Sequence, residues 1–227
     1  MDDINILIDS ADQDDSDYIL ESLEELGVDK IDHFIITHYD NDHVGSAARV
    51  IYKVETDKVY GPDYERDSKR TRNMIEAAST HSSGFSKLRE TISFSTENGD
   101  VTIYPARENY YENENDYSLI ISLTYGTRSF LFTGDAKNVR MAEFNEKCTE
   151  KFDLIKTPHH GNFQKEFNEC LNYAKPRYLV TCTDQRKSVE DTLFSKARNI
   201  GAKLYLTYEG EVTAVCDGTN INISQKH

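Results

Sequence analysis

The chain has 227 residues and a formal net charge of −14, with 37% hydrophobic and 29% charged residues. These fractions are ordinary for a globular protein, and the length allows one large domain or two small ones. The acidic balance argues against a non-specific nucleic-acid coat, because such binding depends on lysine and arginine at phosphates. No apolar run could span a bilayer, and the start of the chain lacks the features of a signal peptide. We therefore expect a cytoplasmic protein with no membrane contact.

The first 60 residues alternate between strand and helix patterns. The predicted order is strand, helix, strand, helix, strand, over residues 4–8, 15–26, 33–37, 44–54 and 57–61. The strand over 33–37 runs directly into the motif THYDNDHVGS. Such alternation predicts an α/β layered domain.

The rest of the chain is less regular at first and then alternates again. Helices are predicted over 64–80, 138–148, 164–174 and 189–200. Strands are predicted over 90–96, 100–106, 118–124, 128–133, 152–157 and 177–183, with a closing hairpin over 203–216 that turns at Glu209-Gly210. The Asn98-Gly99 turn joins the first two of these strands into a hairpin. No repeat or linker divides the sequence, so a single domain over residues 1–227 is expected.

One basic run, RDSKRTR at residues 66–72, stands out in this acidic chain. It could form a local patch that attracts a phosphate-bearing substrate. A solvated helix face is the more common fate of such a run. Both interpretations stay open from the sequence.

Four side chains of the opening motif could bind a metal. His38, Asp40, Asp42 and His43 fall within six positions, between an apolar strand and a helix. Ligands usually bind at this carboxyl end of a strand in open α/β sheets, and imidazole and carboxylate groups suit Zn²⁺, Mn²⁺ or Fe. The same residues are also good turn formers.

Three other apolar strands end in the same way. Asp9, Asp135 and the pair His159-His160 each follow a short apolar strand. If these strands lie side by side, their terminal side chains converge on one rim. A carboxylate such as Asp135 can then bridge two cations, an arrangement used to split phosphate esters.

The sequence resembles the metallo-β-lactamase superfamily, and within it the ComEC-type competence-protein domain. The segments that carry the resemblance are ILIDS, IDHFIITHYDNDHVGS, NDYSLIISLTYGTRSFLFTGD, DLIKTPHHGN and GAKLYLTYEGEVTAV. They occur in the order of the family over nearly the whole chain. The resemblance implies an α/β fold of the metallo-β-lactamase-like αββα sandwich type.

The resemblance also implies a role for each candidate residue. Asp9 would orient the metal loop through hydrogen bonds, and Asp135 would bridge two metals. The implied ligands are His38 and Asp40 for the first metal, and Asp42, His43 and His160 for the second. His159 is then a substrate-facing group, although the histidine pair could act the other way round.

At two positions the sequence departs from the pattern of most of the superfamily. Asp40 stands where most of the superfamily has histidine, as is common in the ComEC-type branch. The separate histidine ligand expected before the strand at 118–124 is missing, and Asn115, Asp116 and Ser118 occupy that region. Asp116 could supply an oxygen there, which would favour Mn²⁺ over Zn²⁺ somewhat.

The chain also starts after the first strand pair of the family. An exposed sheet edge left by that absence would invite dimerisation or pairing with a partner chain.

Together these features predict a metal-dependent hydrolase, a phosphodiesterase or nuclease. It would use a metal-activated hydroxide at a centre of two Zn²⁺ or Mn²⁺ ions, with DNA or RNA as the first substrate to test. Asp42 would partner the attacking water, and His159 could protonate the leaving oxygen. One alternative is a hydrolase of small phosphodiesters or lactones, with a pocket walled by Tyr39, Tyr110, Tyr111 and Tyr117, unless these tyrosines only pack. The other is a catalytically silent binding or regulatory module.

Overall fold

The computed structural model describes residues 4–226, and the chain divides into two compact units between Arg89 and Glu90. Each unit has its own main β-sheet and its own helices. The predicted α/β class is therefore confirmed, whereas one domain over residues 1–227 stays a prediction. Within residues 4–226, none of the helices has the length and apolar content needed to cross a membrane.

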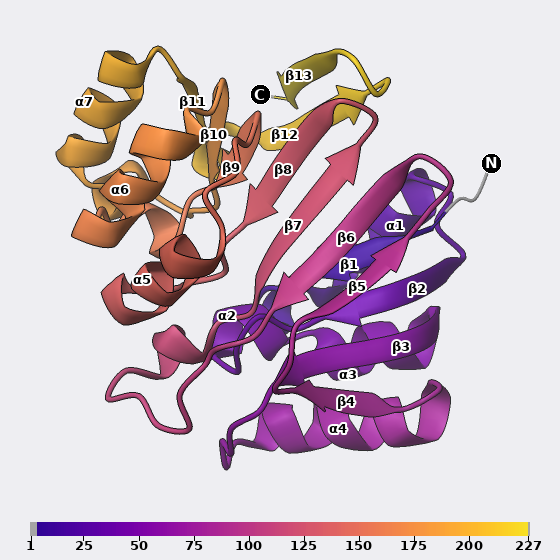
Figure 1. The fold of residues 1–227 in the computed structure, drawn as a ribbon. Helices are drawn as coiled ribbons and strands as arrows, with labels where there is room; N and C mark the ends of the chain where they lie inside the picture. Colours follow the sequence, from indigo (N-terminus) through magenta and orange to yellow (C-terminus); the bar gives the residue numbers. More distant parts are fainter. Residues whose placement is uncertain (1–3, 227) are drawn as a thin grey trace. The chain divides into compact units, whose positions relative to one another are not determined.

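The first unit is a parallel four-stranded sheet in the order β1-β2-β3-β4, covered by helices (Figure 1). Its strands are β1 (Ile6–Ile8), β2 (Lys30–Ile35), β3 (Glu55–Pro62) and β4 (Phe85–Leu88). Its helices are α1 (Ser16–Glu25), α2 (Asn41–Val44), α3 (Ala47–Lys53) and α4 (Lys69–His81), with a 3₁₀ turn at Gln13–Asp15. The sequence predicts this order except for β4 and α2, because α2 lies within the motif that was expected to be a loop and the single helix predicted over 44–54 begins only at Ala47.

The pairing of β1 with β2 brings two sequence motifs together. Ile8 lies opposite Ile35, and the Asp9 backbone N–H donates to the Ile35 carbonyl at 2.9 Å. The loop after β1 then packs on Gly45, directly after α2, where a Cβ atom would lie 2.6 Å from the Gln13 backbone nitrogen and 2.7 Å from the Ala11 carbonyl oxygen. Any larger residue at position 45 would push the two loops apart, which explains the glycine of the motif.

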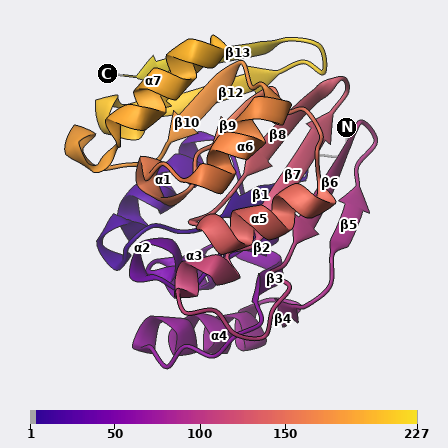
Figure 2. The ribbon, with the colours of Figure 1, turned by 60° about the vertical axis from the view of Figure 1, so that its left-hand side comes forward.

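The second unit contains a seven-stranded mixed sheet in the order β11-β10-β9-β8-β7-β6-β5. Its strands are β5 (Ile92–Ser95), β6 (Gly99–Tyr104), β7 (Ile120–Tyr125), β8 (Arg128–Phe132), β9 (Leu154–Lys156), β10 (Tyr178–Thr181) and β11 (Lys203–Leu206). Figure 2 shows its three α-helices, α5 (Asn138–Lys147), α6 (Lys165–Ala174) and α7 (Asp191–Ile200). The buried core of this unit lies between these helices and the sheet.

Two predicted hairpins of the second unit had different outcomes. The hairpin of β5 and β6 is confirmed, because they pair antiparallel with Ser95 opposite Asp100, but its two-residue turn is Glu97-Asn98, one residue earlier than predicted, and Gly99 already belongs to β6. The closing hairpin at Glu209-Gly210 is wrong. β11 pairs parallel with β10, and a 3₁₀ turn at Thr207–Glu209 leads the chain away into β12 (Glu211–Cys216), which pairs with β13 (Ile221–Lys226).

The four strands with site residues at their ends fall into two sheets. β1 and β2 are parallel neighbours in the first sheet, and β8 and β9 are parallel neighbours in the second. The expectation that all of them lie side by side is therefore wrong. Within each pair, however, the residues after the strands do meet.

Candidate functional site

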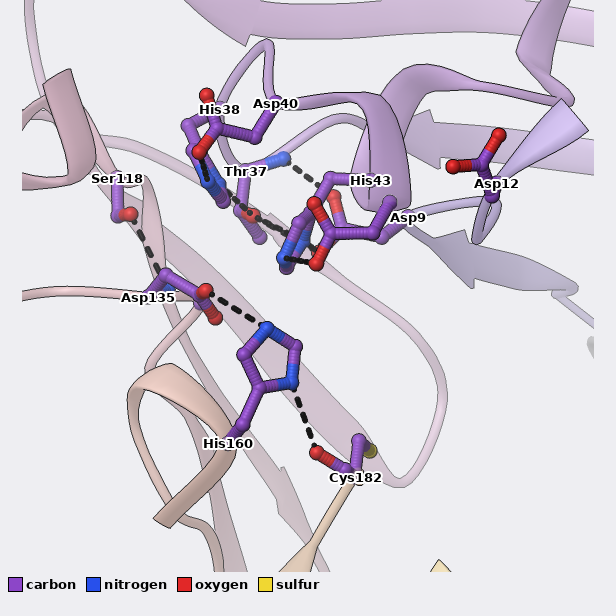
Figure 3. A network of polar contacts seen from close by, with 12 residues as sticks. Asp9, Asp12, Thr37, His38, Asp40, His43, Ser118, Asp135, His160 and Cys182 are labelled. Carbon is purple, nitrogen blue, oxygen red and sulfur yellow. Dashed lines mark hydrogen bonds and ion pairs between the residues drawn. The ribbon is translucent and has the colours of Figure 1, made fainter. Parts of the chain in front are cut away.

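In the first unit, the carboxylate of Asp9 holds the loop that follows β2 (Figure 3). Its Oδ1 accepts the Thr37 backbone N–H at 2.7 Å. Its Oδ2 accepts the Thr37 hydroxyl at 2.8 Å and contacts His43 Nδ1 at 2.7 Å. Asp9 thus links the end of β1 to both ends of the motif THYDNDH.

These contacts fix the tautomers of two histidines. An ionised carboxylate only accepts, so His43 Nδ1 must be the donor to Asp9. The single hydroxyl hydrogen of Thr37 points to Asp9, so His38 Nδ1, 3.2 Å from the Thr37 hydroxyl oxygen, must also donate. In both neutral imidazoles the lone pair is then on Nε2. This is the arrangement that metal-binding histidines adopt when the other ring nitrogen is held by an acceptor.

The remaining polar groups of the motif lie beside these Nε2 atoms. Asp40 Oδ2 is 3.6 Å from His38 Nε2, and Asp42 Oδ2 is 3.7 Å from His43 Nε2. The two imidazole centroids are 4.1 Å apart. Arg66, from the basic run, forms an ion pair with Asp40. The contact with His38 and the charge of Arg66 keep the pKa of Asp40 below its usual range in spite of partial burial.

Asp9 itself has a strained backbone conformation and a largely buried carboxylate. Its backbone has φ of 62°, in the left-handed region. Burial alone would raise its pKa, but the charge and hydrogen bond of His43, with smaller effects from His38 and Thr37, lower it overall. Strained residues persist where the surrounding structure compensates them, and they cluster at functional sites.

The variant Asp9→Asn is expected to weaken binding of Zn²⁺ or Mn²⁺ by about 10- to 100-fold. Asparagine keeps the acceptor for the Thr37 backbone N–H but puts an amide donor against both the Thr37 hydroxyl and His43 Nδ1. His43 would then have to accept there and carry its proton on Nε2, the nitrogen that faces Asp42. Competition titration with a chromogenic chelator measures the affinity. Asp29→Asn, an exposed residue of the same unit, is the control, and equal affinities in all three proteins would contradict this role.

In the second unit, Asp135 and His160 form the corresponding pair (Figure 3). Asp135 is 2% exposed, and its Oδ2 lies 3.2 Å from His160 Nε2. His160 Nδ1 lies 3.0 Å from the carbonyl oxygen of Cys182, which can only accept, so Nδ1 is again a donor, and Nε2 is the nitrogen that faces the Asp135 carboxylate. Lys156 Nζ lies 3.5 Å from Asp135 Oδ1 and donates to the Gly134 carbonyl at 2.9 Å.

The turn that carries the histidine pair is strained in the same way as Asp9. His159 and His160 have φ of 45° and 54°. Gly161 follows with φ of 85°, and a Cβ atom there would lie 2.9 Å from Val189. It is His160 that contacts Asp135, in line with the expected division of roles, which stays a prediction.

The residues in place of the missing histidine have structural partners. The Asp135 backbone N–H donates to the Ser118 hydroxyl at 3.2 Å. Asp116 Oδ1 accepts the backbone N–H groups of Lys137 and Arg140 at 3.0 and 3.1 Å, at the start of α5. Burial raises the pKa of Asp116 in spite of these bonds. A metal-binding role for Asp116 stays a prediction, and Oδ2 would have to serve it. Asn115 is buried next to it in the 3₁₀ turn Glu114–Tyr117.

Comparison with known proteins identifies the family. The profile described as the metallo-beta-lactamase superfamily matches residues 2–185. The chain belongs to the metallo-β-lactamase superfamily. Most members of this superfamily are hydrolases that use divalent metal ions.

The individual members of this superfamily that resemble the chain have low sequence identity to it. ComE operon protein 3 of Bacillus subtilis (strain 168) is 20% identical over 163 residues, covering 71% of this chain and 21% of that protein. The chain therefore matches about a fifth of that relative's length. The metallo-beta-lactamase fold protein YhfI from Bacillus subtilis has a TM-score of 0.57 and 13% identity, covering 91% of this chain and 85% of that one. CmlA, a diiron beta-hydroxylase from Streptomyces venezuelae, has a TM-score of 0.54 and 13% identity, covering 78% of this chain and 43% of that one.

The residues present fit the divalent metals of the superfamily. His38 Nε2 is buried, and no residue between positions 4 and 226 forms a hydrogen bond with it. The donors of both units are imidazole nitrogens and carboxylate oxygens, the set that binds Zn²⁺, Mn²⁺ and Fe. A buried imidazole nitrogen without such a bond is costly unless something else uses its lone pair.

The sequence did not point to three groups that contact the candidate ligands. Lys156 appears only as the polar end of a strand, and Arg66 as one member of the basic run. The Cys182 carbonyl has no sequence signature at all, because every residue has one. Of the tyrosines considered as a pocket wall, Tyr39, Tyr111 and Tyr117 are buried in packing, whereas Tyr110 is 75% exposed.

Proposed function

We propose that this chain is a metal-dependent phosphodiesterase. The observation that supports the proposal is the shared state of three histidines, His38, His43 and His160. Each has Nδ1 held by an acceptor and Nε2 next to a carboxylate. Metal-binding histidines adopt this pattern, in which an acceptor holds one ring nitrogen and the other is left for the ion.

The proposed ligands follow the order of the family motifs. His38 and Asp40 would hold one ion, Asp42, His43 and His160 a second, and Asp135 would be shared. When bound, Zn²⁺ or Mn²⁺ would supply Lewis-acid stabilisation of charge on a phosphoryl oxygen and would lower the pKa of water.

The chain's own residues have separate proposed tasks. Asp9 and Thr37 keep the protons of His38 and His43 on Nδ1. Asp42, whose side chain is 49% exposed, would accept a hydrogen bond from the attacking water. His159 would donate a proton to the leaving oxygen. A diester of DNA or RNA is the proposed substrate class, in a protein we propose to be cytoplasmic.

Metal analysis and hydrolysis assays test the proposal together. Purified protein is expected to contain at least one Zn²⁺ or Mn²⁺ per chain and to cleave bis-p-nitrophenyl phosphate and single-stranded DNA. EDTA should abolish both activities, and added Mn²⁺ or Zn²⁺ should restore them. Protein with less than one metal per chain and no rescue would instead be a silent module of the same fold. Cleavage of lactones but not of diesters would also overturn the proposal.

A further inference from the structure

A groove lies among the helices of the first unit, outside the candidate metal ligands. Its volume is about 620 Å³, within the usual range for small-ligand sites. The lining residues come from the 3₁₀ turn and start of α1, from α3 with the preceding loop, and from the first turns of α4. They are Gln13, Asp14, Ser16, Asp17, Gly45, Ala48, Arg49, Tyr52, Lys53, Lys69, Arg70 and Asn73.

The lining is basic although the chain is acidic. Four of these residues are basic and two are acidic, against a net charge of −14 for the whole chain. Arg49 forms an ion pair with Asp17 and a hydrogen bond to Ser16. Lys53 and Lys69 make neither a hydrogen bond nor an ion pair with any residue of the described part of the chain. Two positive charges are therefore uncommitted in the groove.

The start of α4 adds a second positive feature. Its first turn contains Lys69 and Arg70 and no acidic residue, and Ser68 caps it by accepting the Thr71 N–H at 3.0 Å. Cationic side chains are repelled by the partial positive charge at the start of a helix, and a bound anion would offset this repulsion. Arg70 Nη2 reaches Asp12 at 3.4 Å, but its buried Nε–H donates to no group within residues 4–226.

Tyr52 gives the groove an aromatic wall. The residue is 48% exposed, and its ring plane lies at 84° to that of His81, with the centroids 4.6 Å apart. An exposed aromatic ring beside several cations is the combination that stacks nucleobases and contacts their phosphates.

We propose that this groove binds a nucleotide unit, with its phosphates on Lys53, Lys69 and Arg70 and its base against Tyr52. Binding there needs none of the proposed metal ligands, so it goes beyond the proposed hydrolysis and does not depend on it. The same chemistry is offered by a free nucleoside polyphosphate and by a segment of single-stranded nucleic acid. The basic run at 66–72 then supplies part of a ligand site.

Binding measured without metal tests this proposal. The full chain in EDTA is titrated by fluorescence anisotropy into a fluorescein-labelled oligothymidylate, and separately into a fluorescent ATP analogue. The double variant Lys53→Ala/Lys69→Ala should weaken whichever ligand binds by about tenfold. For the oligonucleotide, the slope of log affinity against log salt should also fall by about two. Tyr52→Ala should weaken binding without changing that slope.

A matched control removes the same charge elsewhere. Lys147→Ala/Lys151→Ala changes two exposed lysines of the second unit and should bind as the wild type does. Oligonucleotide binding without ATP binding assigns the groove to a strand, and the reverse assigns it to a free nucleotide. Binding of neither, or equal loss in both double variants, overturns the proposal. If the wild type does not hydrolyse diesters, only the proposed function is overturned, because these titrations measure binding without turnover.

Discussion

Replacing Asp135 with alanine is expected to lower the hydrolysis of bis-p-nitrophenyl phosphate by at least about 10³-fold. The residue is 2% exposed, and its carboxylate contacts both His160 Nε2 and Lys156 Nζ. Alanine removes an anion that both groups contact, which is also the proposed shared metal ligand. Asp42→Ala should cause a loss of similar size, because it removes an oxygen donor and the proposed partner of the attacking water.

Two exposed carboxylates provide matched controls for this experiment. Glu24→Ala on α1 and Glu169→Ala on α6 each remove one negative charge from a helix surface. Their rates should stay within about twofold of the wild type, as is usual for surface substitutions. Metal content and far-UV circular dichroism separate loss of ligands from loss of fold. Unchanged rates in both Asp42→Ala and Asp135→Ala would show that the ligand assignments are wrong.

The elements that the sequence predicted are those whose cause is local. The Asn-Gly signal predicted the hairpin to within one residue of its turn, and the apolar spacing in residues 138–148 predicted α5. β4 was missed because Phe85–Leu88 is four residues long, contains a lysine and lacks a continuous apolar run. The predicted pairing of β12 with β11 is wrong. The sequence around Gly210 allows such a hairpin, whereas the observed pairing of β12 with β13 depends on residues after position 220.

The candidate ligands were predictable for a similar reason. His38, Asp40, Asp42 and His43 are close in the sequence, and strand ends in parallel sheets share an edge. Their hydrogen-bond partners were harder to predict. The carbonyl of Cys182 lies 22 residues from His160. Asp116 accepts the Lys137 N–H at the start of α5 from a position 21 residues earlier in the sequence. Helix caps are recognised from residues within a few positions of the helix start, so this one could not be predicted.

The same limit hid a buried arginine that supports Asp135. Arg140 is 1% exposed, and its guanidinium donates to the carbonyl groups of Ser118 at 2.9 Å and Tyr104 at 2.6 Å. Glu143, also buried, lies 3.5 Å from Arg140 Nη1. Burial lowers the pKa of Arg140 to about 10, against the opposing charge of Glu143, so Arg140 is charged at neutral pH.

Several loop contacts depend on this pair. Glu143 accepts the Tyr111 hydroxyl at 2.6 Å and the Arg107 N–H at 3.1 Å. Arg140 holds the backbone of Ser118, whose hydroxyl accepts the Asp135 N–H. The chain between β6 and β7 is therefore fixed to α5 partly through this ion pair, in addition to the bonds of Asp116, and Asp135 is positioned against it.

Arg140→Met is expected to lower the free energy of unfolding by about 3–5 kcal/mol. Methionine fills much of the space but leaves Glu143 as a buried carboxylate without its cation and removes one donor from each of two carbonyl groups. That loss is a large share of the roughly 5–15 kcal/mol that stabilises a typical protein. Urea unfolding followed by circular dichroism measures it as a lower midpoint.

A double-mutant cycle isolates the ion pair from the packing. Arg140→Met/Glu143→Gln should be more stable than Arg140→Met alone, because the buried charge is removed together with its partner. Arg198→Met, an exposed arginine on α7, should change the unfolding free energy by less than about 0.5 kcal/mol. If the double variant is no more stable than Arg140→Met, the cost comes from the hydrogen bonds lost at the carbonyl groups of Tyr104 and Ser118. In that case Arg140 stabilises this part of the second unit mainly by donating hydrogen bonds to backbone carbonyl groups, and its ion pair with Glu143 contributes less.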